Sequence, residues 1–197
     1  MSQTNFAALL TEIRACRVCA AQLPHEPRPV LRARASARLV IVGQAPGTRV
    51  HASGKPFTDP SGDRLRNWLG VDSETLYDER HIAIVPMGFC FPGLDAHGGD
   101  LPPRRECAPL WRERLFAELK QIKLTLLVGQ YAQAWHLKDR RKSTLTETVK
   151  AWREYGQEFM PLPHPSWRNN AWVKKNPWFE AELLPVLRRR VAEALAD

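Results

Sequence analysis

The sequence contains no long hydrophobic run and few cysteines. No apolar stretch approaches the roughly 18 residues of a membrane-spanning helix. Residues 1–10 lack the basic segment followed by an apolar one that marks a secretory signal. We therefore expect a cytoplasmic protein without membrane contact. In a reducing compartment the four cysteines are not expected to form structural disulfides, so a joint role for them would be metal ligation or redox chemistry.

Internal repeats and low-complexity linkers are also missing, which excludes a repeat array. The chain has 197 residues, and we expect residues 1–197 to form a single domain. Its composition, 44% hydrophobic and 25% charged, excludes a collagenous or largely disordered chain. The formal net charge of +8 favours a polyanionic partner such as nucleic acid, and the alternative is a basic surface with no such partner.

Four short apolar segments alternate with segments of helical periodicity. The first apolar segment ends at Gly43, in the pattern of a strand buried on both faces. Ser61 and Gly70 would begin and end the helix that follows it. This alternation predicts an α/β fold in which a mainly parallel sheet is covered on both faces. The predicted strands are residues 39–42, 81–85, 124–128 and 158–162, and the predicted helices include 61–69, 110–122, 143–155 and 177–196.

The loops after the first, second and fourth predicted strands carry unusual residues. In parallel sheets, ligands bind at the carboxyl ends of the strands. These loops span residues 44–60, 86–107 and 163–170, so the sequence predicts a binding site at that edge.

The cysteines are spaced in a way that suits a metal. Cys16 and Cys19 are separated by two residues, which lets adjacent thiolates hold one metal centre, while Cys90 and Cys107 bracket a loop of sixteen residues. The alternatives are a redox pair beside two unrelated thiols, or four buried thiols that pack as small hydrophobic groups. Spacing alone does not distinguish zinc from an iron–sulfur cluster.

The segment Gly43-Gln-Ala-Pro-Gly47 is not a phosphate-binding P-loop. Such a loop requires Gly-Lys-Ser/Thr, whereas Lys55 follows Gly54 but precedes Pro56. The glycines instead allow the backbone to approach a ligand closely at the end of a strand.

His164 follows the fourth predicted strand. A lone histidine can be structural, but this one lies on a strand-end loop beside Trp167 and Arg168. Arg168, Lys174 and Lys175 can pair with phosphates, and nearby tryptophans offer stacking surfaces when they are not packed in the core.

Four short motifs occur in a fixed order. They are Gly43-Gln-Ala-Pro-Gly47, then Gly54-Lys-Pro-Phe-Thr58 with Ser61-Gly-Asp63, then the proline-rich loop between Cys90 and Cys107, and then His164-Pro-Ser166. Together with the paired cysteines, this order resembles the uracil-DNA glycosylase superfamily, and most closely its iron–sulfur families, numbered four and five. The resemblance covers residues 16–189.

The resemblance implies a three-layer α/β/α sandwich with a central four-stranded sheet. It also implies a 4Fe-4S cluster on Cys16, Cys19, Cys90 and Cys107, with zinc as the less favoured alternative. Phe57 matches the aromatic that stacks on a base flipped out of DNA, and His164 matches the histidine that supports the leaving base. Trp167 or Arg168 matches the residue that enters the minor groove.

These matches give the candidate site residues. The catalytic candidates are His164, which stabilises the leaving group, and Asp59, Asp63 or Gln44, which would orient a water. The substrate-binding candidates are Gly43, Ala45, Pro46, Gly47, Phe57 and Ser166. The DNA-binding candidates are Trp167, Arg168, Lys174 and Lys175.

The sequence departs from family four in three places. Gln44 stands where that family has a glutamate, and Thr48, Arg49 and Val50 replace the acidic residues that follow this motif. Pro86 stands where family four has the asparagine that reads the uracil edge. The resemblance therefore leaves the preferred base open. We predict a monomeric, monofunctional DNA glycosylase that excises uracil or a related deaminated or damaged base from single- or double-stranded DNA. The alternative is a non-catalytic iron–sulfur protein that binds nucleic acid on the same fold.

Overall fold

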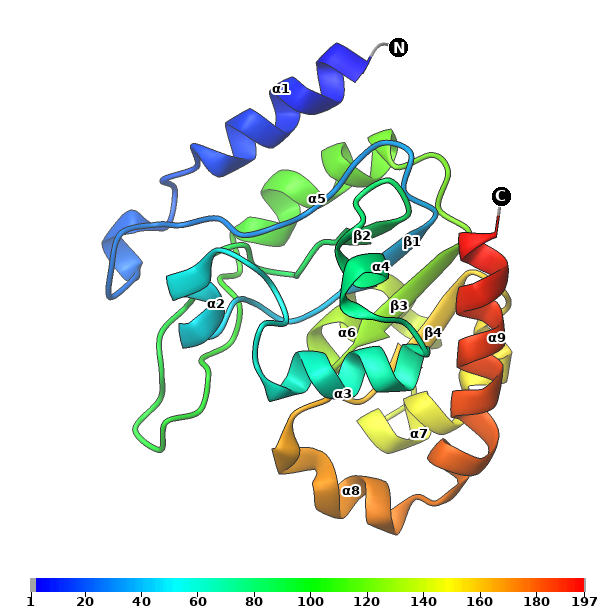
Figure 1. Ribbon diagram of the computed structural model, residues 1–197. Coiled ribbons are helices and arrows are strands. Elements are labelled where there is room, and N and C mark those ends of the chain that lie inside the picture. The colour runs from blue at the N-terminus through cyan, green and yellow to red at the C-terminus, as the bar shows by residue number, and fades with distance from the viewer. Residues whose placement is uncertain (1–2, 197) are drawn as a thin grey trace.

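The computed structural model describes residues 3–196, and its centre is a four-stranded sheet in the order β2-β1-β3-β4 (Figure 1). The strands are β1 (Leu39–Val42), β2 (Ile82–Ile84), β3 (Leu124–Val128) and β4 (Phe159–Leu162). All three pairings are parallel. The prediction of a mainly parallel α/β sheet is confirmed, and β4, which contains Pro161, lies at an edge, where a missing backbone N–H is tolerated.

Successive side chains of β1 point to opposite faces of the sheet, and each face is covered by helices. Val40 and Val42 belong to one apolar cluster, whereas Leu39 and Ile41 belong to the other. The helices of the first cluster are α1 (Gln3–Arg14), α5 (Cys107–Glu118) and α6 (Gln130–Leu137). Those of the second are α3 (Pro60–Leu69), α4 (Ser73–Tyr77), α7 (Leu145–Lys150) and α9 (Leu184–Leu195). The three layers predicted from the resemblance are therefore present (Figure 1).

The N-cap of helix α3 lies two residues earlier than the sequence suggested. Asp59, not Ser61, is its N-cap, and the Asp59 side chain accepts a hydrogen bond from the Gly62 N–H. Pro60 explains the difference, because its fixed φ angle suits the first helical position and moves the cap to the residue before it. Gly70 ends the helix in the left-handed conformation, as predicted.

Several short helices lie in segments that were expected to be loops or longer helices. Helices α2, α4 and α8 had not been predicted, and the helices expected over 143–155 and 177–196 are each divided. The additional elements are α2 (Thr48–Ser53), α8 (Asn170–Lys175), 3₁₀ turns at Ala20–Gln22, Lys138–Arg140, Trp152–Tyr155 and Trp167–Asn169, and a π-helical segment at Phe179–Leu183. Within residues 3–196, no helix has the length and apolar character needed to cross a membrane.

Candidate functional site

A cavity opens at the carboxyl edge of the sheet, where the loops after β1, β2 and β4 meet. All of residues 43–47 line it, together with Phe57, Asp59 and His164. The structure thus brings together most of the predicted catalytic and base-binding residues. Asp63 and Ser166 are not among the lining residues. Asp63 is largely exposed on α3 and forms an ion pair with Arg66.

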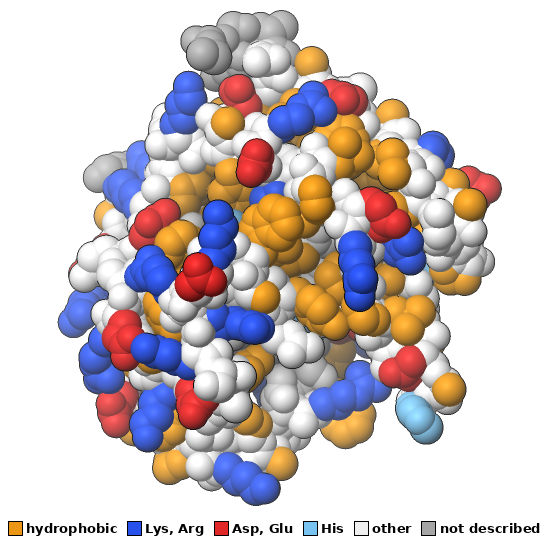
Figure 2. Space-filling model, turned by 180° about the vertical axis from the view of Figure 1, so that it is seen from behind, with side chains coloured by type: hydrophobic (Ala, Val, Ile, Leu, Met, Phe, Trp, Pro, Cys, Tyr) orange, Lys and Arg blue, Asp and Glu red, His pale blue; other side chains and the backbone are white. Residues whose placement is uncertain are grey.

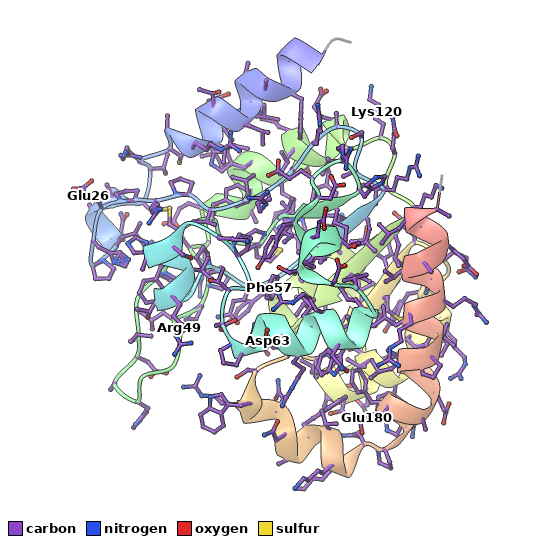
Figure 3. The ribbon with its side chains drawn as sticks, viewed as in Figure 1. Glu26, Arg49, Phe57, Asp63, Lys120 and Glu180 are labelled. Carbon is purple, nitrogen blue, oxygen red and sulfur yellow. The ribbon has the colours of Figure 1, made fainter. Side chains whose placement is uncertain are left out.

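Phe57 is held in a conformation that few non-glycine residues adopt. Its φ angle is 55°, and side chains at such positive φ are uncommon and are often found at functional sites. Figure 3 shows Phe57 on the segment that joins α2 to α3. Its ring tip lies 3.7 Å from the position a Cβ would take on Gly43. The aromatic ring therefore packs against the end of β1.

Two contacts fix the Phe57 backbone. The Tyr77 hydroxyl lies 2.9 Å from the Phe57 carbonyl oxygen and 2.7 Å from that of Pro56. The same Phe57 carbonyl would be 1.8 Å from a Cβ at position 62, so only glycine fits there. Gly62 was predicted only as part of a motif, and its close approach to Phe57 supplies the physical reason for a glycine.

His164 is buried and oriented by the loop that carries it. Its Nδ1 atom accepts a hydrogen bond from the Ser166 N–H at 3.2 Å, and its carbonyl accepts one from the Asn169 side chain at 2.7 Å. Burial lowers the pKa of the imidazole, while the nearby Asp59 carboxylate acts in the opposite direction. Because Nδ1 accepts, the proton of the neutral ring resides on Nε2. His164 can therefore donate a hydrogen bond through Nε2.

Sequence reasoning missed one acidic residue of the cavity. Asp100, on the loop between β2 and α5, lines the cavity, and its carboxylate oxygen lies 3.3 Å from the position of a Cβ on Gly47. The only sequence signal for Asp100 was its position on the loop after the second strand. Asp95 lies on the same loop, and no local sequence pattern distinguishes the two aspartates. Asp59 is a helix cap, and the Gln44 amide donates to the Leu101 carbonyl at 3.2 Å.

The segment that follows His164, residues 166–170, is called the rim here, and it presents an exposed tryptophan. Trp167 is 69% exposed, and the guanidinium of Arg168 lies 5.5 Å from the centre of its ring. Arg168 also donates to the Gly98 carbonyl at 3.3 Å, which joins the rim to the loop after β2. Arg64 of α3 bonds the Ser166 carbonyl and the Asn170 side chain. The predicted wedge residues thus lie on a loop that is fixed from two sides.

Lys174 and Lys175 lie in the last turn of α8 and are exposed. Figure 2 shows that Lys and Arg side chains on the rear face are interspersed with acidic ones. The net positive charge is therefore not gathered into one patch on that face.

All four cysteines line a second cavity, between the segment after α1 and the start of α5. No disulfide joins any two of these four cysteines. The Phe89 N–H donates to the Cys107 sulfur at 3.4 Å. Burial raises the pKa of Cys107 to about 12 and that of Cys90 to about 11, so metal-free thiols in this cavity keep their protons at neutral pH. Among residues 3–196, no group of three or more His, Cys, Asp or Glu side chains is arranged to hold a single metal ion.

Residues 32–188 match the sequence model of the Uracil DNA glycosylase superfamily. This match spans most of the chain. The chain belongs to the uracil DNA glycosylase superfamily. Among solved structures, it is similar to the solution NMR structure of a candidate uracil DNA glycosylase from Methanosarcina acetivorans, at 17% identity and a TM-score of 0.48, with coverage of 82% of this chain and 98% of that one.

Membership of the uracil DNA glycosylase superfamily supports a function of the DNA glycosylase type and implies that the chain binds DNA. The matched region contains β1 to β4 and all of the residues that line the carboxyl-edge cavity except Val30, but not Cys16 and Cys19. The two CxxC cysteines therefore precede the part of the chain that the superfamily model describes.

Proposed function

We propose that this protein is a monofunctional DNA glycosylase that flips and hydrolytically excises uracil or a related deaminated or damaged base, and so initiates base excision repair. The observation that carries the proposal is the pairing, in one cavity, of an aromatic ring and a neutral histidine donor. Phe57 supplies a stacking face, and His164 supplies an N–H group at the same edge of the sheet.

The chain's own residues account for capture of the base. A base inside a duplex must be extruded, at a cost of a few kcal/mol of unstacking. Stacking on Phe57 offsets part of this cost, since such contacts are worth about 1–3 kcal/mol per base. Trp167, at the exposed rim, would occupy the space that the base leaves, and Arg168 would contact the phosphate backbone.

His164 accounts for departure of the base. As the bond between the sugar and the base breaks, the electron pair moves onto the base. A preorganised N–H donor stabilises charge that develops only in the transition state. The buried, neutral His164 needs no proton transfer to provide that donor.

We further propose that the four cysteines hold a 4Fe-4S cluster. Support comes from their chemistry, because the four thiols line one cavity and a backbone N–H points at the Cys107 sulfur. When bound, the cluster would tie the segment after α1 to the start of α5. No step of base excision is assigned to it.

One observation favours the non-catalytic alternative. Pro86 lines the cavity, at the position where family four has a base-reading asparagine. The cavity then has fewer polar groups that could read a base edge. In that case the protein would bind damaged DNA without excising the base.

A single assay separates the two functions. Duplex and single-stranded oligonucleotides that each contain one uracil, hypoxanthine or xanthine are incubated with cluster-replete protein and then treated with alkali, which cleaves abasic sites. The glycosylase function predicts cleavage at the modified position, and His164→Ala should abolish most of it. Binding without cleavage on every substrate would establish the non-catalytic alternative.

A further inference from the structure

The loop between β2 and α5 contains a small hairpin that presents a carboxylate to the cavity. Leu94 and Asp100 form an antiparallel bridge at its base. The turn is closed by the Asp95 side chain, which accepts from the N–H groups of His97 and Gly99, both at 2.8 Å. Leu101 donates to the Gly93 carbonyl at 3.0 Å on the other side of the bridge. Asp100 is therefore held on a closed turn.

The carboxylate of Asp100 lies directly over Gly47. Its two oxygens are 3.3 and 3.6 Å from the position of a Cβ on that glycine, so the missing side chain allows the close approach. Asp100 and His164 line the same cavity but come from loops after different strands. Two groups on separate loops can act on opposite sides of a bound sugar.

The other three candidates for orienting a water are less suited. Asp63 is outside the cavity and paired with Arg66. Asp59 accepts from the Gly62 N–H as the cap of α3. Gln44 lacks a carboxylate, and its amide donates to a backbone carbonyl. Among the described residues, no side chain or backbone group forms a hydrogen bond or an ion pair with the Asp100 carboxylate.

We propose that Asp100 is the catalytic general base that orients and deprotonates the attacking water, an inference that rests on the proposed glycosylase function. In this step, the water oxygen forms a bond to the sugar carbon C1′ and the bond from C1′ to the base nitrogen breaks. The electron pair of that bond leaves with the base, whose charge His164 stabilises. The water proton passes to the Asp100 carboxylate, and the base is later protonated from solvent.

The charged groups around Asp100 suit it to this task. Asp100 is an exposed residue, yet partial desolvation of its carboxyl raises its pKa. Asp59 at the start of α3 and Asp95 in the hairpin raise the pKa further, while Arg168 on the rim lowers it. A carboxylate with a raised pKa is a stronger base than an ordinary aspartate, which suits it to accept a proton from water.

The test compares Asp100→Asn and Asp100→Ala with the wild type in single-turnover release of the base, measured by chromatography. The matched control is Asp139→Asn, an exposed aspartate in the 3₁₀ turn after α6. Asp100→Asn should release the base about 10²-fold or more slowly, whereas Asp139→Asn should match the wild type. Added formate should partly restore base release in Asp100→Ala, because it can occupy the vacated space and accept the proton.

The pH profile provides a readout that a structural role would not change. In the wild type the rate rises with pH as both His164 and Asp100 lose a proton, and Asp100→Asn should remove one of these two ionisations. If Asp100→Asn releases the base at a rate within about twofold of the wild type, the proposal for Asp100 is wrong. It is also wrong if the rate falls but formate does not restore it in Asp100→Ala and the low-pH part of the profile is unchanged in Asp100→Asn. A wild type that releases no base from any substrate overturns the glycosylase function itself, and the inference about Asp100 fails with it.

Discussion

The hydroxyl of Tyr77, the last residue of α4, lies between the carbonyl oxygens of Pro56 and Phe57, at 2.7 and 2.9 Å. A hydroxyl has one proton, so it can donate fully to only one of the two carbonyls at a time. The Lys55 ammonium lies 3.8 Å from the centre of the Tyr77 ring. Tyr77 therefore links α4, which packs against the sheet, to the segment that carries Phe57.

We expect Tyr77→Phe to remove the hydrogen bond that fixes the backbone at Phe57 and to leave the packing of the core unchanged. The lost hydrogen bond should lower the free energy of unfolding by about 1 kcal/mol, measured by urea denaturation. Affinity for lesion-containing DNA should also fall, because the stacking face is less well fixed. Tyr131→Phe is the matched control, since the Tyr131 hydroxyl bonds no described residue. Equal DNA affinity in the two variants would exclude a positioning role for Tyr77.

Replacement of His164 by alanine should act on the transition state. Single donors of this kind contribute roughly 10²- to 10³-fold in rate, so single-turnover excision should fall by about that factor. Affinity for lesion-containing DNA should be almost unchanged. Phe57→Ala should instead weaken capture of the base, by about 1–3 kcal/mol. If the wild type is active and His164→Ala excises the base at the same rate, this assignment is wrong.

Freshly prepared protein should be brown and absorb broadly in the visible range. Replacement of Cys90 or Cys107 by alanine should bleach it and lower its melting temperature, because the free energy of metal binding contributes to folding. The iron and sulfide content per chain provides the measurement. Anaerobically purified protein that contains one zinc ion and no iron would refute the iron–sulfur assignment while retaining the four ligands.

Removal of one cation on the rim and two on α8 should change the salt dependence of DNA binding. Arg168, Lys174 and Lys175 are expected to contact phosphates, and each such contact contributes roughly one unit to the slope of log affinity against log salt concentration. The triple alanine variant should therefore show a shallower slope with the same preferred base. An unaltered slope would place the DNA on another face, such as that of the arginines between residues 28 and 38.

The free energy of unfolding should fall as the pH is lowered, because the fold disfavours the protonated form of His136. The Arg112 guanidinium lies 3.4 Å from Nε2 of His136, and burial together with Arg112 lowers the pKa of His136 to about 3. An unfolded histidine takes up its proton near pH 6.5. The unfolded chain thus binds one more proton between pH 6.5 and 3, so the free energy of unfolding should fall by up to about 1.4 kcal/mol per pH unit.

Denaturant unfolding at several pH values measures this slope. His136→Gln removes the titrating ring and should flatten the dependence between pH 6 and 4. His164 and His51, whose pKa values are also lowered by burial, account for any slope that remains. A variant with the slope of the wild type would show that His136 titrates normally.

The sheet could be predicted because its strands are short apolar runs that end at glycine or proline. Helices α2, α4 and α8, by contrast, have five or six residues each, too few for a periodic pattern to emerge. The predicted cap of α3 is wrong because serine is a common cap residue, whereas Pro60 suits the first helical position and places the cap at Asp59. These errors are local, and none of them altered the predicted topology.

The candidate site was predicted in its position but not in all its members. Motifs placed Phe57, Asp59 and His164 on strand-end loops, and parallel strands bring such loops together. Asp63 was predicted because it belongs to the same motif as Asp59, yet one turn of helix points it outward. Asp100 was missed because its approach to Gly47 depends on the hairpin, a tertiary contact that no local pattern reveals.

The cysteine cavity is assembled from two segments that are far apart along the chain. Cys16 and Cys19 follow α1, whereas Cys90 and Cys107 flank the loop that leads into α5, so β1 and β2 lie between the two pairs. Residues 20–89 separate Cys19 from Cys90, so bringing the two pairs together costs loop-closure entropy in the unfolded chain, whereas the fold already holds them at one cavity. A cluster bound to all four thiols would therefore favour the folded chain, as a cross-link between its N-terminal segment and the start of α5 would.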